Sequence, residues 1–253
     1  IFTKIKKKIC KFLNIHPRTL YDFKIKKRKS SDKDIDKNVK KIYNKLNKRF
    51  LEYDMFIKHN KIFLTYGDLK FKKSRERIVN EANQLNYFNN IIMETEKTIL
   101  DDEFQKALKN KKFRNVFNNK RGGGYWLWKP YIIYKNNKLI NDNDILIYSD
   151  AGSTIYNNKN TYNKLNKYIN IINKSSKGIL GFKNDQIESK WTKGDIFKHF
   201  NCLNNKDIYN TTQFSGGSLH IVRKCKYSLY IYKLWWDTAR KFPELFDDKT
   251  NKI

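Results

Sequence analysis

The chain has 253 residues, which is enough for one large α/β domain or two small ones with a substantial core. Its 54 Lys and Arg against 25 Asp and Glu give a formal net charge of +29, yet the excess is mostly scattered Lys, so we expect no specific nucleic-acid partner. The three cysteines, Cys10, Cys202 and Cys225, exclude a disulfide framework and a CxxC metal site, and no apolar run reaches the 18 residues of a membrane span.

Residues 1–58 are dense in Lys, and we expect them to form a basic helical extension and linker. The charged segment 24–40 cannot bury a core, and helices are expected before it and near residues 39–53. The first helix could lie on an anionic membrane surface or pack on the domain as a solvated arm, and both alternatives stay open. Residues 59–253 form the predicted globular domain, with truncation at its carboxyl end as one option.

The domain begins with a strand, a helix and a strand, predicted at residues 62–66, 72–87 and 91–93. Such a unit makes a right-handed crossover between parallel strands. Later helices are expected at 101–117, 125–139, 162–173, 193–200 and 227–242, and later strands at 145–148, 179–182 and 217–222. Strands alternating with helices predict a mostly parallel sheet flanked by helices, which binds ligands at the carboxyl ends of its strands.

The strand at 145–148 is the clearest buried strand, and it leads into Ser149-Asp150-Ala151-Gly152. A carboxylate at a strand end, followed by two small residues, leaves room for a bulky ligand and a divalent cation. Oxygen ligands of this kind suit Mg²⁺ or Mn²⁺ carrying a diphosphate. The alternative is that Asp150 only caps a turn, because Asp and Gly are common turn residues.

Upstream of this strand, residues 121–131 concentrate glycine, aromatic and basic side chains. Consecutive glycines let a backbone approach a ligand, and Arg121 and Lys129 could bind phosphate oxygens. Trp126 and Trp128 could form stacking surfaces for a sugar or a base. Each could equally be a core residue of the following helix, and this alternative stays open.

The run Arg-Gly-x-Gly-Tyr-Trp-x-Trp-Lys-Pro-Tyr at 121–131, followed by Asp-x-Asp-Ile-Leu-x-Tyr-x-Asp-Ala-Gly at 142–152, resembles a glycosyltransferase family of the GT-A type. That family occurs in bacterial polysaccharide clusters and in large DNA viruses, and the resemblance covers roughly residues 60–245. It implies a Rossmann-like fold, a nucleotide-sugar donor such as a UDP-sugar, and a glycan or glycoprotein acceptor. It also implies a divalent cation, Mn²⁺ or Mg²⁺, on Asp150. Gly152 stands where the wider fold has a second Asp, so Asp150 is either the sole carboxylate ligand or a ribose or sugar contact.

The resemblance extends to three further segments. Residues 66–68 follow the first strand where such enzymes hold base and ribose, residues 188–195 match the acceptor side, and residues 213–218 match a small-residue turn at the donor sugar. The candidate catalytic residues are therefore Asp150, Glu188 and Asp195, and the candidate donor-binding residues are Tyr66, Gly67, Arg121, Trp128, Lys129, Ser149, Gly152, Gln213, Gly216 and Gly217. An inverting reaction would need Glu188 or Asp195 as a base, whereas a retaining front-face reaction would need none.

Two other functions stay open at this point. A basic nucleic-acid-binding module would use the scattered Lys on phosphates and the aromatic residues on bases. An inactive GT-A-like domain that binds a glycan or a partner would explain why the motif lacks a second Asp and why no histidine follows His220. For the glycosyltransferase and for both alternatives we expect a cytoplasmic location. If the chain is viral, this would be the host cytoplasm or a virus factory. Membrane association through the N-terminus is an option.

Overall fold

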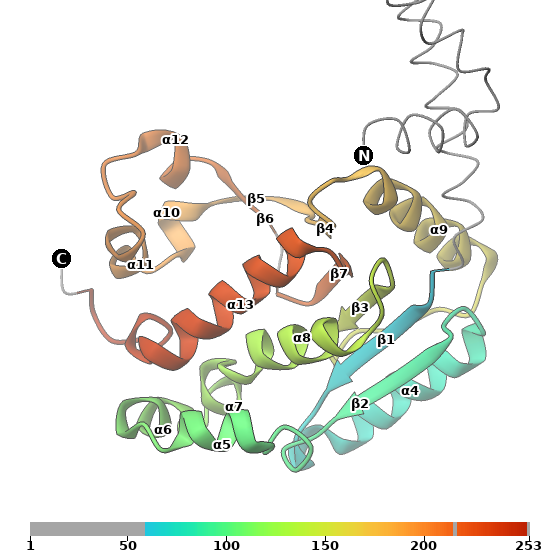
Figure 1. The fold of residues 1–253 in the computed structure, drawn as a ribbon, viewed down its shortest axis with the longest axis horizontal. Helices are drawn as coiled ribbons and strands as arrows, with labels where there is room; N and C mark the ends of the chain where they lie inside the picture. Colours follow the sequence, from blue (N-terminus) through green and yellow to red (C-terminus); the bar gives the residue numbers. More distant parts are fainter. Residues whose placement is uncertain (1–58, 215–216, 252–253) are drawn as a thin grey trace, which may run out of the picture. The chain divides into compact units, whose positions relative to one another are not determined.

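The computed structural model describes residues 59–214 and 217–251, so the predicted N-terminal extension 1–58 lies outside the described residues. The described chain forms an α/β domain around an open five-stranded sheet (Figure 1). Its strands, in spatial order, are β2 (Asn90–Glu94), β1 (Lys61–Tyr66), β3 (Ile145–Ser149), β7 (Leu219–Arg223) and β4 (Ile179–Leu180). Strands β2, β1 and β3 run parallel, and β7 runs antiparallel to both of its neighbours. The predicted mostly parallel sheet flanked by helices is confirmed.

The central strands β1 and β3 are apolar because helices cover both of their faces. Every residue of β3 is buried, as are five of the six residues of β1. Side chains alternate between the faces, so Leu64 and Tyr148 belong to one core cluster and Phe63 and Ile147 to the other. This burial explains why near-continuous apolar runs mark these two strands in the sequence.

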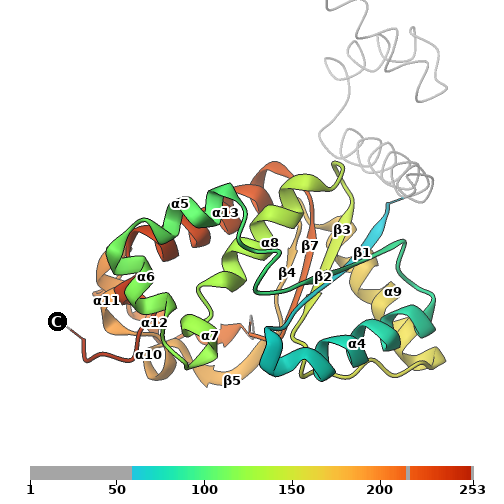
Figure 2. The same cartoon turned by 90° about the horizontal axis from the view of Figure 1, so that it is seen from below.

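Two groups of helices cover the sheet (Figure 2). The helices α4 (Lys72–Leu85) and α9 (Lys159–Lys174) lie on one side, and α5 (Asp102–Leu108), α6 (Lys111–Phe117), α8 (Trp128–Leu139) and α13 (Lys226–Lys241) lie on the other. The second side carries an aromatic core in which the Trp236 ring stacks on Phe104 with centroids 5.7 Å apart. The Tyr131 ring lies 4.7 Å from the same indole. These contacts fix α8 and α13 on the sheet.

Three predicted elements differ from the structure. The helical stretch at 101–117 is two helices, because the Asn110 side chain accepts a hydrogen bond from the Lys112 N–H at 2.9 Å and starts a new helix. The predicted helix at 125–139 begins only at Trp128. The predicted strand at 179–182 ends at Leu180.

A second, smaller sheet follows β4 and was not predicted. It pairs β5 (Lys183–Ile187) with β6 (Thr212–Phe214) in antiparallel fashion. Between these strands lie three short helices, α10 (Glu188–Trp191), α11 (Gly194–His199) and α12 (Lys206–Tyr209). The short helix α7 (Gly122–Tyr125) and the 3₁₀ turns η1 (Leu69–Phe71) and η2 (Pro243–Leu245) complete the elements of the described ranges. We refer to residues 183–214 as the small lobe.

Candidate functional site

Asp150 lies at the carboxyl edge of the sheet, directly after β3. The backbone N–H of Asp150 donates to the Ser218 carbonyl oxygen at 2.9 Å, which fixes the end of β3 against the start of β7. Its side chain is 34% exposed, in contrast to the buried strand before it. Asp144, at the other end of β3, accepts hydrogen bonds from the backbone N–H groups of Asn60 and Asn141 and so has a structural role. Asp150 is therefore the carboxylate that this strand presents for chemistry.

One carboxylate oxygen of Asp150 is held by two neighbours. The Lys129 Nζ lies 2.9 Å from Asp150 Oδ1, and the Tyr148 hydroxyl donates to the same oxygen. Lys129 is only 7% exposed, and its ammonium also donates to the Gly217 carbonyl oxygen. Burial lowers the pKa of Lys129 and raises that of Tyr148, whose pKa the Asp150 carboxylate raises further. Lys129 thus sits behind Asp150 and positions it.

The segment after β1 lies beside Asp150. Strands β1 and β3 pair in parallel with Leu64 opposite Tyr148, and the Thr65 hydroxyl donates to the Ser149 carbonyl oxygen at 2.8 Å. Tyr66 is largely buried and stacks on Trp128, with ring centroids 3.9 Å apart and planes 28° apart. One face of each ring is thereby covered. The predicted residues Tyr66, Trp128 and Ser149 hold the edge of the sheet together.

Residues 122–126 form a left-handed turn, where a glycine-rich loop leading into a helix was predicted. All five residues have positive φ: 57° at Gly122, 57° at Gly123, 93° at Gly124, 51° at Tyr125 and 56° at Trp126. Glycine adopts this conformation freely, whereas Tyr125 and Trp126 adopt it at a cost of about 1–2 kcal/mol each. A side chain at Gly122 would meet the Trp126 indole, whose nearest atom would lie 2.5 Å from the added Cβ. Backbone strain of this kind is concentrated at functional sites.

These segments enclose a cavity of about 350 Å³, which we call the strand-end cavity. It is lined by Tyr66, Gly67, Asp68, Lys70, Phe71, Lys120, Gly122, Gly123, Trp126, Trp128, Asp150, Ala151 and Gly152. Of the predicted site residues, Tyr66, Gly67, Trp128, Asp150 and Gly152 come together here. Asp68, Lys70, Phe71 and Lys120 were not predicted as site residues, and Trp126 was considered only as a stacking surface or a core residue. The 45% exposure of the Trp126 side chain makes it the open stacking surface of the cavity, whereas Trp128 is buried.

The other predicted residues lie elsewhere. Arg121 is 61% exposed and pairs with Asp248, and it is not among the lining residues of the strand-end cavity. Glu188 and Asp195 belong to the small lobe, where the Glu188 carboxylate accepts from the Thr192 hydroxyl and the Asp195 N–H donates to Asn251. Gly217 contacts the site through its carbonyl oxygen, which accepts a hydrogen bond from the Lys129 ammonium.

The structure does not describe two predicted residues of the small-residue turn in full. Gln213 is part of β6, but its side chain is outside the described part of the structure. Gly216 lies outside the described residues altogether. Their predicted contact with a donor sugar therefore stays a prediction.

The residues around Asp150 fit a divalent cation poorly. One oxygen of this single carboxylate already accepts from an ammonium and a phenol. Gly152 has no side-chain ligand, and in the described ranges no group of three or more His, Cys, Asp or Glu side chains could hold a metal ion. Metal sites for Mg²⁺ or Mn²⁺ normally combine several oxygen ligands.

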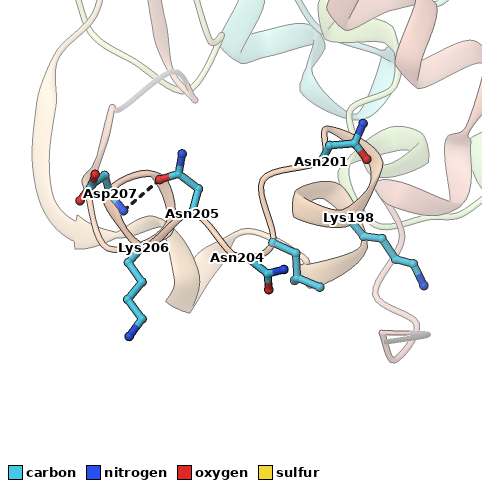
Figure 3. Close-up of a pocket in the computed structure, with 7 residues that line it drawn as sticks. Lys198, Asn201, Asn204, Asn205, Lys206 and Asp207 are labelled. Atoms are coloured by element: carbon cyan, nitrogen blue, oxygen red, sulfur yellow. Dashed lines mark hydrogen bonds between the residues drawn. The ribbon is translucent and has the colours of Figure 1, made fainter.

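A larger cavity of about 650 Å³ lies between α11 and α12 in the small lobe (Figure 3). Its lining is Lys198, Asn201, Leu203, Asn204, Asn205, Lys206 and Asp207. The Asn205 side chain accepts from the Asp207 N–H at 3.1 Å and so caps α12. This cavity offers neither an aromatic surface nor a carboxylate at a strand end, so we regard the strand-end cavity as the candidate functional site.

No helix of the described ranges is long and apolar enough to cross a membrane. Two comparisons with known proteins give no match: no protein-family model matches the chain, and no curated protein sequence matches it. The functional interpretation therefore depends on the residues and the geometry of the strand-end cavity.

Proposed function

We propose that the chain is a glycosyltransferase that binds a nucleotide-sugar donor, such as a UDP-sugar, in the strand-end cavity. The observation that supports this most is the meeting of Asp150 and residues 66–68 at the carboxyl ends of adjacent parallel strands, on one cavity. Open α/β sheets bind their ligands at this edge. The exposed indole of Trp126 adds a stacking surface of the size of a base or a sugar ring.

The exposed part of the Asp150 carboxylate would accept hydrogen bonds from donor hydroxyls. Lys129 and Tyr148 hold Oδ1, which leaves Oδ2 for a ribose or sugar hydroxyl in the cavity. A carboxylate held in this way orients its partner without having to reorganise during the reaction. Asp150 would therefore position the donor.

In the reaction, the bond from the anomeric carbon to the diphosphate oxygen breaks and a bond to the acceptor oxygen forms, while the acceptor hydroxyl loses its proton. An inverting reaction requires a base for that proton. Asp68 is the second carboxylate on the strand-end cavity, and it joins Glu188 and Asp195 as a candidate for this role. A retaining front-face reaction needs no such base, because the departing diphosphate oxygen takes the acceptor proton. In both, the cavity acts by positioning and electrostatics.

The test is a thermal-shift panel with UDP, GDP, CMP and their common sugar conjugates, because a ligand that binds only the native state raises its apparent stability. We expect one nucleotide to raise the melting temperature of the wild type and of the exposed control variant Asp142→Ala. The variants Asp150→Ala and Asp150→Asn should bind that nucleotide at least about tenfold more weakly.

The two Asp150 variants serve different purposes. Alanine leaves the buried Lys129 ammonium without its carboxylate and will reduce stability, whereas asparagine keeps the shape of the side chain and an oxygen for Lys129. Release of the free nucleotide from the conjugate that binds, as UDP, GDP or CMP, would then demonstrate transfer or hydrolysis. If no nucleotide binds, or if both Asp150 variants bind as the wild type does, the proposal is wrong.

A further inference from the structure

We infer that the strand-end cavity binds the donor diphosphate through Lys70 and Lys120, without a divalent cation on Asp150. This inference rests on the proposed function, because it concerns how the same cavity recognises the charged part of its donor. The ligand class is a nucleoside diphosphate, with inorganic pyrophosphate as its simplest probe.

The surroundings of Asp150 already contain a fixed cation. The Lys129 ammonium lies 2.9 Å from Oδ1 and is nearly fully buried, so it cannot move into solvent to make room. A metal ion on Asp150 would lie beside this positive charge and would be repelled by it. Asp150 and Lys129 together carry no net charge, which removes most of the attraction that a carboxylate offers to a cation.

Gly152 stands where the motif would have a second Asp, and no other carboxylate of the described residues takes its place beside Asp150. A Cβ added to Gly152 would meet nothing within 4 Å, so no other side chain of the described residues fills that space. Asp68, the other carboxylate on the cavity, accepts a hydrogen bond from the Phe71 N–H at 3.2 Å and caps η1. The diphosphate therefore needs positive charge from another source.

Two lysines on the cavity supply that charge. Lys70 lies in η1, which follows the end of β1, and Lys120 lies just before Arg121 and the left-handed turn, so the two reach the cavity from different segments. Both are exposed, so their flexible side chains can adapt to a ligand. Two ammonium groups can neutralise much of the charge of a diphosphate and donate hydrogen bonds to its oxygens. Arg121, by contrast, is paired with Asp248.

Isothermal titration of the full chain with UDP and with pyrophosphate, in EDTA and in MnCl₂, tests this inference. We expect the dissociation constants in EDTA and in Mn²⁺ to agree within about threefold. The double variant Lys70→Ala/Lys120→Ala should bind both probes about 100-fold more weakly, roughly tenfold for each charge-assisted contact. The matched control is Lys106→Ala/Lys109→Ala, which removes the same charge from exposed positions of α5 and its carboxyl end.

The outcomes separate this inference from the proposed function. UDP binding that disappears in EDTA and returns with Mn²⁺ would overturn the inference and leave the proposed donor site in place. Equal affinities of the two double variants would overturn the assignment to Lys70 and Lys120. Absence of UDP binding under both conditions would overturn the inference and also the proposed UDP donor.

Discussion

Lys129 is the residue on which the geometry of Asp150 depends. A buried ammonium is unfavourable unless it is paired and hydrogen-bonded, and Lys129 has both the Asp150 carboxylate and the Gly217 carbonyl oxygen. The pKa of Lys129 is still lower than that of an ordinary lysine, because burial lowers it more than Asp150 raises it. Lys129 should consequently lose its proton at a lower pH than a lysine side chain in water does.

This shift predicts opposite effects of alkaline pH on stability and on ligand binding. The relevant pH range lies between the lowered pKa of Lys129 in the folded chain and the ordinary lysine pKa in the unfolded chain. In this range Lys129 is more fully protonated in the unfolded chain than in the folded chain. Its contribution to the free energy of unfolding therefore rises with pH. Over the same window Asp150 loses its positioning cation, so UDP binding should weaken. Thermal unfolding and titration with UDP, measured as the pH is raised from neutral towards the ordinary pKa of lysine, follow the two trends.

The variant Lys129→Met is the control for that prediction, because methionine fills similar volume and does not titrate. Its UDP affinity should be reduced at neutral pH, and the weakening with pH that Lys129 causes should be missing. A variant that keeps the wild-type pH profile would show that another group causes the loss of binding. Weakened binding together with falling stability in the wild type would point to general alkaline unfolding instead.

Among the elements, the left-handed turn at 122–126 depends most on its glycines. Gly124 has φ of 93°, and a Cβ there would lie 2.4 Å from the Phe117 carbonyl oxygen, which is a backbone atom and cannot move aside easily. Gly124→Ala should therefore lower the free energy of unfolding by about 3 kcal/mol, from backbone strain and overpacking together. Urea denaturation measures this difference.

Gly152→Ala is the matched change, at a glycine that lines the strand-end cavity. A Cβ at Gly152 meets nothing within 4 Å, so the free energy of unfolding should stay within about 1 kcal/mol of the wild type. Similar losses in the two variants would mean that the left-handed turn does not set the requirement for glycine. Wild-type stability of Gly124→Ala would lead to the same conclusion.

The same elements show what the sequence could and could not predict. Strands β1 and β3 were predicted because burial on both faces requires apolar runs, and their parallel pairing brings the predicted residues Tyr66 and Asp150 to one edge. Strand β5 was missed because its residues, Lys-Asn-Asp-Gln-Ile, show no apolar pattern. The left-handed turn was missed because residue preferences give Tyr125 and Trp126 no reason to adopt positive φ.

The sequence predicted those site residues whose position follows from the strand or turn that contains them. Arg121 looked like a phosphate ligand because it precedes three glycines, yet its guanidinium pairs with Asp248, 127 residues later in the chain. Lys70 and Lys120 had no motif of their own, and only the folded cavity brings them to one place. Pairings between residues so distant in sequence depend on tertiary packing and have no local signal.

At the scale of the whole domain, the C-terminal segment links parts that are far apart in sequence. Helix α6 packs on η2, where Leu245 is buried. Asp247 then pairs with Lys193 of the small lobe at 2.7 Å, and Asp248 pairs with Arg121 beside the left-handed turn. The segment thus contacts both the small lobe and the flank of the strand-end cavity.

The two adjacent ion pairs differ in burial, and this difference predicts different effects on stability. The side chains of Lys193 and Asp247 are 13% and 4% exposed, so Asp247→Ala leaves a largely buried ammonium without its carboxylate and should lower the free energy of unfolding by about 3 kcal/mol. Arg121 and Asp248 are 61% and 49% exposed, so Asp248→Ala should cost less than about 1 kcal/mol. Urea denaturation of both variants measures these values. UDP affinity should stay unchanged in both, because neither aspartate lines the strand-end cavity.

Two results would contradict these expectations. Equal losses of stability in the two variants would show that the buried pair does not hold the small lobe to the C-terminal segment. A loss of UDP affinity in Asp248→Ala would show that Arg121 acts on the donor.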